Sequence, residues 1–311
     1  MKTFNLPGTD LVAPAIVTGV MRIQEKTDAE VRALFDASLA AGINFFDHAA
    51  VYGSELHGCE RRFAEALSLT PLQRDEITLQ TKAGIIPEDG PYFDFSYEQL
   101  ISSVDDSLAA LNTDRIDILL LHRPDALVEP EEVAKAFDEL ESTGKVRHFG
   151  VSNHSPAQIE LLKKYVSQPL VANQLQLSIT HSPLIAQGVA SNMLGEDQSI
   201  DRDRGILDYC RLHDITVQAW SPFQGGFFDG VFLDSPKYPE LNAVLDRLAA
   251  QYDVPPIAIA TAWITRHPAR MQVVLGTTNT DRVAGAAQGS DIPLTRAEWY
   301  DLFRAAGHIV P

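Results

Sequence analysis

SYEQLISSVDDSLAALNTDRIDILLLHRPDALVEPEEVAKAFDELESTGKVRHFGV, residues 96–151, is the stretch that decides the fold class. Apolar residues recur at helical spacing over 96–111 and 130–142, and a short apolar run follows each of these segments, at 116–121 and 146–151. A period of 3.6 residues predicts an amphipathic helix, whereas a short apolar run rich in branched residues predicts a buried strand. The stretch therefore predicts alternating helices and strands, which is the pattern of a parallel sheet.

The same alternation runs along nearly the whole chain. Thr27 and Glu30 form a capping-box signature at the start of a helical segment, and Gly42 follows its end. A closed barrel of eight strand–helix units needs roughly 250 residues, and the chain has 311. We therefore predict an α/β fold, a (β/α)8 or TIM barrel of eight parallel strands with outer helices. The candidate strands are 16–20, 43–47, 77–81, 116–121, 146–151, 170–174, 216–220 and 271–275.

No linker or shift in composition divides the chain, so we expect residues 1–311 to form a single barrel domain. Three segments are longer than a minimal barrel needs, namely 85–95, 178–204 and 222–238, and a helical tail follows residue 294. Long loops in compact domains are commonly functional. We expect these loops to border the site.

Composition excludes several classes of function. The chain has 42 acidic and 25 basic residues, a net charge of −17, which disfavours binding to nucleic acid or an anionic membrane. Cys59 and Cys210 are isolated, so neither a metal site nor a disulfide framework is expected. Pro7 and Pro14 interrupt the N-terminal apolar residues, and no long apolar span follows. We expect a cytoplasmic protein, a monomer or small homo-oligomer.

Polar residues follow three consecutive predicted strands. Asp47 ends the second strand and Tyr52 comes five residues later, Lys82 follows the third strand, and His122 follows the fourth. The carboxyl ends of barrel strands meet at one mouth, where the active sites of such barrels lie. We therefore expect these four side chains to converge.

Their chemistry suits the protonation of an alkoxide. A lysine ammonium next to Tyr52 favours the phenolate and lowers the pKa of the phenol, while Asp47 would keep Lys82 charged and oriented. His122 could donate a hydrogen bond to a substrate oxygen. An alkoxide forms when hydride adds to a carbonyl, and hydride must come from a cofactor. Each residue alone has an ordinary structural explanation, but the ordered set favours catalysis.

The segments that carry this set resemble those of the aldo-keto reductase family, in particular a bacterial-type oxidoreductase subgroup. FDHAAVYG, residues 46–53, resembles the family's D-x-A-x-x-Y-G segment, and Lys82 and His122 follow in the family's order. GKVRHFGVSN, residues 144–153, resembles its G-K-[VI]-R-x-x-G-[VL]-S-N segment. The resemblance extends over roughly residues 10–290.

The resemblance implies an NADP(H)-dependent oxidoreductase that reduces a small aldehyde or ketone or oxidises the matching alcohol. Asp47, Tyr52, Lys82 and His122 would be the catalytic tetrad, with Tyr52 as proton donor. Three groups of residues would hold the cofactor, at the carboxamide, at the nicotinamide ring and at the phosphates. Ser152, Asn153 and Gln174 would bind the carboxamide, and Trp220 would stack on the nicotinamide ring. The phosphates would be held by Ser221, Pro222, Phe223, Gly225, Gly276, Thr277, Thr278 and Arg282.

Elementary chemistry supports these assignments. Trp220 offers a flat aromatic platform, and amide side chains match a carboxamide. The residues from 276 lead into a predicted helix near Thr280, whose N-terminus suits an anion. Gly285 and Ala286 stand where the family has Glu and Asn, which leaves Arg282 to recognise a 2′-phosphate. We expect NADPH, with NADH as the alternative.

The substrate and two other functions stay open. Tyr92, Phe93 and Phe95 could form an apolar rim for a small aromatic or aliphatic carbonyl, or simply a packed loop. Arg123 could attract an acidic substrate or pair with an aspartate. One alternative is a Schiff-base lyase with Lys82 as nucleophile. The other is a cofactor-binding regulatory or scaffold subunit.

Overall fold

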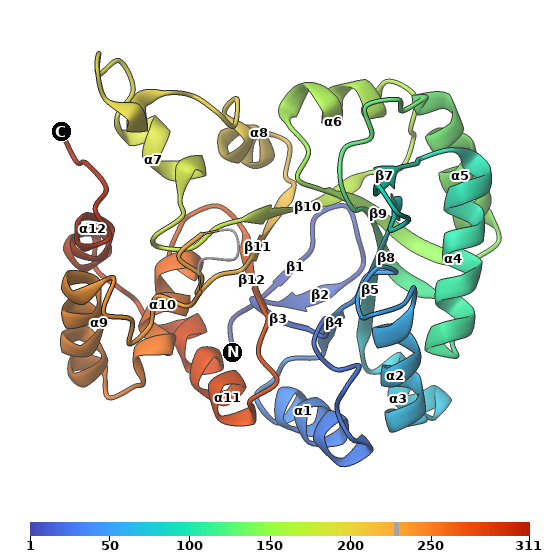
Figure 1. The fold of residues 1–311 in the computed structure, drawn as a ribbon, viewed down its shortest axis with the longest axis horizontal. Helices are drawn as coiled ribbons and strands as arrows, with labels where there is room; N and C mark the ends of the chain where they lie inside the picture. Colours follow the sequence, from blue (N-terminus) through green and yellow to red (C-terminus); the bar gives the residue numbers. More distant parts are fainter. Residues whose placement is uncertain (227–229) are drawn as a thin grey trace.

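The structure is a computed structural model that describes residues 1–226 and 230–311. Within these residues, eight parallel strands close into a barrel in the order β10-β11-β12-β3-β4-β5-β8-β9, with helices around it (Figure 1). The predicted barrel is confirmed. The strands are β3 (Ile16–Gly19), β4 (Phe45–Asp47), β5 (Thr78–Ala83), β8 (Ile116–Leu121), β9 (Val146–Ser152), β10 (Leu170–Gln176), β11 (Thr216–Trp220) and β12 (Met271–Leu275).

The strands are buried on both faces because helices cover them outside and side chains fill the barrel inside. Every residue of β5 and β8 is buried. The barrel closes where β12 pairs with β3, with Val273 opposite Ile16. Two observed bounds matter for the site, since β5 and β10 run to Ala83 and Gln176, two residues beyond the predicted ends.

Local signals account for the helix ends. Thr27 caps α1 and forms the predicted capping box with Glu30. Pro130 and Pro156 begin α5 and α6. Proline is tolerated in the first turn because the N–H that it lacks would have no acceptor within the helix. The helices are α1 (Asp28–Ala40), α2 (Gly58–Leu67), α3 (Pro71–Asp75), α4 (Tyr97–Leu111), α5 (Pro130–Ser142), α6 (Pro156–Lys163), α7 (Pro183–Val189), α8 (Ile206–Leu212), α9 (Pro239–Tyr252), α10 (Pro256–Thr265), α11 (Thr280–Gln288) and α12 (Arg296–Ala305).

A hairpin that the sequence did not predict closes one end of the barrel. Strands β1 (Thr3–Asn5) and β2 (Val12–Pro14) pair antiparallel and lie across the middle of the ring in Figure 1. Leu6 of this hairpin is fully buried and belongs to the same apolar cluster as Phe45, Ile118 and Leu120 from the barrel interior. The hairpin is therefore part of the core, and the polar site must lie at the other end.

The three long segments carry small elements of their own. Residues 85–95 contain the hairpin β6 (Ile85–Ile86) and β7 (Tyr92–Phe93), and 178–204 contain α7 and the turn η1 (Asp197–Ser199). A second turn, η2 (Gly289–Asp291), precedes α12. In the segment 222–238, residues 227–229 lie outside the described part. None of the described helices combines the length and apolar character needed to cross a bilayer.

Candidate active site

The structure brings Asp47, Lys82 and Tyr52 together at the carboxyl ends of β4 and β5. Lys82 Nζ lies 2.8 and 2.7 Å from the two carboxylate oxygens of Asp47 and 2.7 Å from the carbonyl oxygen of His48. The same ammonium donates to Tyr52 Oη at 3.1 Å. Tyr52 therefore accepts from Lys82 and keeps its own O–H free to donate.

Burial sets the direction of the tyrosine pKa. Burial raises the pKa of Tyr52, and the Lys82 ammonium offsets only part of this rise. The expected lowering of the Tyr52 pKa is therefore wrong as a net result, although Lys82 acts in the expected direction. For Lys82, burial alone would lower the pKa, but the Asp47 carboxylate and Tyr52 outweigh it and raise the pKa. Lys82 is thus a charged ammonium.

His122 packs against the ring of Tyr52. Their ring centroids are 5.9 Å apart and the rings meet edge to face. Burial, together with the charges of Lys82 and Arg123, lowers the pKa of His122 well below its usual value, so the imidazole is neutral. Among the described residues, no group hydrogen-bonds its buried Nδ1. A neutral imidazole still has one N–H to donate.

A layer of glutamines that the sequence did not predict lies beneath Asp47, Lys82 and Tyr52. The interior of such barrels is usually filled by branched aliphatic side chains, but Gln80 and Gln218 exchange hydrogen bonds of 2.9 and 3.0 Å across the barrel. Gln80 and Gln174 also donate to Asp47 Oδ1, at 2.6 and 3.1 Å. The sequence does hold a sign of this layer, because each of the predicted strands 77–81, 170–174 and 216–220 contains a glutamine among its apolar residues.

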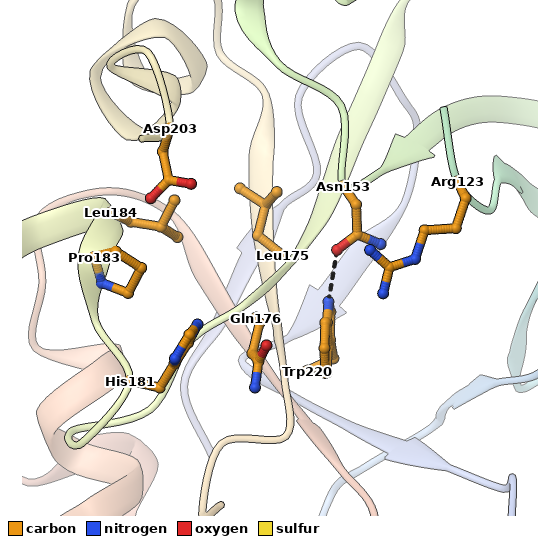
Figure 2. Close-up of a pocket in the computed structure, with 9 residues that line it drawn as sticks. All are labelled: Arg123, Asn153, Leu175, Gln176, His181, Pro183, Leu184, Asp203 and Trp220. Carbon is orange, nitrogen blue, oxygen red and sulfur yellow. Dashed lines mark hydrogen bonds between the residues drawn. The ribbon is translucent and has the colours of Figure 1, made fainter. Parts of the chain in front are cut away.

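The residues expected at the carboxamide lie next to the tetrad. Trp220 Nε1 donates to Asn153 Oδ1 at 3.1 Å (Figure 2). Asn153 Nδ2 donates in turn to Ser152 Oγ at 2.7 Å. The amide of Asn153 is thus held by its neighbours. Gln174 donates inward, and no donor within the described residues reaches its Oε1, which leaves that oxygen available to a ligand N–H.

The residues expected at the phosphates follow two adjacent strands. The loop 221–225 comes after β11, and residues 276–278 come after β12 and lead into α11. Ser221, the first residue after β11, has a left-handed φ of 52°. Asn279 caps α11 by accepting from Arg282 N at 2.9 Å, and Arg282 is exposed in the first turn. The two loops therefore reach the same side of the mouth.

A cavity of about 440 Å³ opens beside Trp220. Figure 2 shows Arg123 and Asp203 on opposite sides of Leu175 in this cavity. Arg123 lies over the Trp220 ring, 5.7 Å from its centroid, and makes no hydrogen bond or ion pair with the described residues. The possible Arg123–aspartate pair is therefore absent from that part of the chain.

Two further polar atoms of the lining are buried and lack partners among the described residues, Gln176 Nε2 and Asp203 Oδ2. The aromatic residues expected at the rim do not line this cavity. Phe95 is buried and stacks on His154, while Tyr92 and Phe93 are exposed on β7. The cavity is therefore more polar than the expected aromatic rim.

Comparison with known proteins identifies the family. The sequence model of the Aldo/keto reductase family matches residues 15–305. This chain belongs to the aldo/keto reductase family. An uncharacterized oxidoreductase, YcsN, of Bacillus subtilis is 34% identical over 97% of both chains. A 6-dehydroglucose reductase of Agrobacterium fabrum is 35% identical, over 94% of this chain and 93% of its own.

A solved aldo-keto reductase has the same fold. The thermostable enzyme Tm1743, crystallised with the inhibitor epalrestat, superposes with a TM-score of 0.77 at 22% identity, covering 98% of this chain and 100% of its own. The family match and the two relatives, rather than this superposition, make the protein an oxidoreductase of the aldo/keto reductase type. A lyase with Lys82 as nucleophile does not agree with this, since an ammonium paired to Asp47 has no free electron pair.

Proposed function

We propose that this aldo/keto reductase reduces a small carbonyl compound with NADPH and that Tyr52 donates the proton. The observation that carries the proposal is the chain of contacts from Asp47 through Lys82 to Tyr52 Oη, at 2.7 and 3.1 Å. Because Lys82 donates to Tyr52, the phenol O–H is the donor left for a substrate oxygen.

Each member of the tetrad has a distinct part in this proposal. Bound NADPH would supply the hydride. Tyr52 gives its proton to the oxygen that becomes negative, and the Lys82 ammonium stabilises the phenolate that remains. The neutral imidazole of His122 donates a second hydrogen bond to the same oxygen. Asp47 keeps Lys82 charged and fixed in place.

The cofactor residues fit a nicotinamide dinucleotide. Gln174 Oε1 is free to accept from the carboxamide, with Ser152 and Asn153 beside it. The N-terminus of α11 and the small residues before it suit phosphate oxygens. Arg282 is exposed in that first turn, where it can pair with a 2′-phosphate, and this favours NADPH over NADH.

The cavity supports a substrate that carries hydroxyl groups. A hydroxyl both donates and accepts, and it can satisfy the carboxylate of Asp203 as well as the donors of Arg123 and Gln176. An apolar substrate would leave these groups unpaired, at a cost of about 1–3 kcal/mol each. The name of the Agrobacterium relative, a 6-dehydroglucose reductase, agrees with such a carbonyl compound.

The first experiment follows the oxidation of NADPH, and separately NADH, with 4-nitrobenzaldehyde. We expect Tyr52→Phe to lower kcat at least about a hundredfold, because general acid catalysis contributes roughly 10²–10⁴-fold, with cofactor binding retained. Tyr165→Phe is the matched control, since Tyr165 is exposed after α6. Cofactor binding without turnover on a broad carbonyl panel would instead support the regulatory or scaffold subunit.

The same assay tests the substrate class with two aldehydes of equal carbon number, glyceraldehyde and propanal. We expect kcat/KM to be at least tenfold higher for glyceraldehyde, the effect of about 1.4 kcal/mol from hydroxyl hydrogen bonds. Equal values for the two aldehydes would refute recognition of hydroxyl groups and leave the reductase assignment intact.

A further inference from the structure

Glu60 is a carboxylate buried outside the barrel, behind the strand that carries Lys82. It lies in the first turn of α2 and is 0% exposed. Burial raises its pKa, but hydrogen bonds from His57 and Thr81 and the nearby His48 outweigh this and lower it, so the carboxylate is ionised. A buried charge is costly unless it is hydrogen-bonded. The groups that donate hydrogen bonds to Glu60 therefore identify the segments of the fold that it connects.

These partners come from three different elements. Thr81 of β5 donates to Glu60 Oε1 at 2.5 Å, and Ser107 of α4 donates to Oε2 at 3.1 Å. His57, at the end of the loop between β4 and α2, lies with its Nδ1 2.6 Å from the same Oε2. Thr81 immediately precedes Lys82, and the loop ending at His57 carries Tyr52. Glu60 therefore links the strand of the lysine to the loop of the tyrosine.

The backbone of that loop is tied to the same contacts. His57 has a left-handed φ of 60°, and its N–H donates to the Ala50 carbonyl at 2.6 Å. Ala50 N–H in turn donates to the Lys82 carbonyl at 3.0 Å, and Cys59 N–H donates to the Tyr52 carbonyl at 3.0 Å. If the contacts of Glu60 shift, these hydrogen bonds shift the backbone at Ala50 and at Tyr52 as well.

We propose that Glu60 is a positioning residue that, through His57 and Thr81, sets the 3.1 Å contact between Tyr52 Oη and Lys82 Nζ. The inference rests on Tyr52 as proton donor. Proton transfer requires a donor within hydrogen-bond reach of its acceptor, and a displacement of about 1 Å can cost a hundredfold in rate. Loosening the link changes the catalytic step and leaves the cofactor residues on β9 to β12 in place.

The test uses Thr81→Val, which removes the hydroxyl at almost constant volume, and Thr81→Ser, which keeps it. We expect Thr81→Val to lower kcat between about tenfold and a hundredfold, with the KM for 4-nitrobenzaldehyde and the Kd for NADPH within twofold of the native values. Thr81→Ser should restore most of kcat. Thr216→Val is the matched control, because Thr216 is buried on β11 and its hydroxyl has no partner among the described residues.

A double-mutant cycle separates positioning from a purely structural effect. If Thr81 acts through Tyr52, Thr81→Val has no further effect on the residual rate of Tyr52→Phe. Equal losses of kcat in both backgrounds, or native kcat in Thr81→Val, overturn the proposal. Ser107→Ala, which removes another partner of Glu60, is measured in parallel and should lower kcat in the same way if Thr81→Val does not fold. Native activity in Tyr52→Phe would instead refute the proposed function.

Discussion

His48, the residue directly after the end of β4 at Asp47, is a fully buried histidine. Its two ring nitrogens have no hydrogen-bond partner among the described residues. Its ring packs edge-on against Phe63, with centroids 4.8 Å apart. Burial lowers the pKa of His48 from 6.5 to about 4, although the carboxylates of Glu60 and Asp47 oppose this. The folded protein therefore keeps His48 neutral where an unfolded chain would protonate it.

This difference makes stability depend on pH. The unfolded state binds the proton first as pH falls below 6.5, so the contribution of His48 to stability falls between pH 6.5 and about 4 and levels off below that range. At pH 5 the loss from His48 is about 2 kcal/mol. We expect His48→Leu to show a correspondingly smaller decline between pH 8 and pH 5 in urea unfolding. His213→Leu, at an exposed position, is the control. An unchanged decline in His48→Leu would contradict this account.

At the scale of the element, α11 joins helix capping to the proposed cofactor site. Asn279 satisfies the backbone N–H of Arg282 and holds the first turn in place. The free N–H groups of that turn and the helix dipole both favour an anion. The same cap should therefore affect the stability of the protein and its affinity for the phosphates of a cofactor.

We expect Asn279→Ala to cost about 1 kcal/mol of stability and to raise the Kd for NADPH roughly two- to fivefold. Thr295→Ala is the matched control, because Thr295 caps α12 in a capping box with Glu298 and α12 lies against α9, away from the mouth (Figure 1). It should lose similar stability with no change in Kd. Equal effects on NADPH binding in the two variants, measured by fluorescence titration, would count against a cofactor role for α11.

The whole molecule divides into an apolar end and a polar end. The β1–β2 hairpin fills one end with Leu6, which packs into the cluster of Phe45 and Ile118, and the glutamine layer separates that end from the tetrad. Tryptophans 263 and 299 stack far from the hairpin in sequence, with ring centroids 4.8 Å apart. We propose that all these parts belong to one cooperative domain.

Leu6→Ala tests this proposal, because removing a fully buried leucine side chain costs about 2–5 kcal/mol. We expect a single unfolding transition in which tryptophan fluorescence and far-ultraviolet circular dichroism shift together to lower denaturant. Separate transitions by the two probes, with only one of them moved by Leu6→Ala, would show that the chain folds as more than one unit.

Local sequence patterns were enough to predict the barrel and the order in which the four proposed catalytic residues follow its strands. Strands, helices and caps such as Thr27 follow from local periodicity and from side chains that bond their own backbone, and these act within a few residues. The rule that the carboxyl ends of parallel strands meet at one mouth was then enough to bring Asp47, Tyr52 and Lys82 together.

Four features could not be predicted without the folded structure: the net pKa of Tyr52, the glutamine layer, the polar cavity and the contacts of Glu60. Each depends on burial or on partners far apart in the chain, as with Gln80 and Gln218, which are 138 residues apart. Desolvation in particular depends on everything that surrounds a group, so a neighbouring charge read from the sequence cannot by itself give the direction of a pKa.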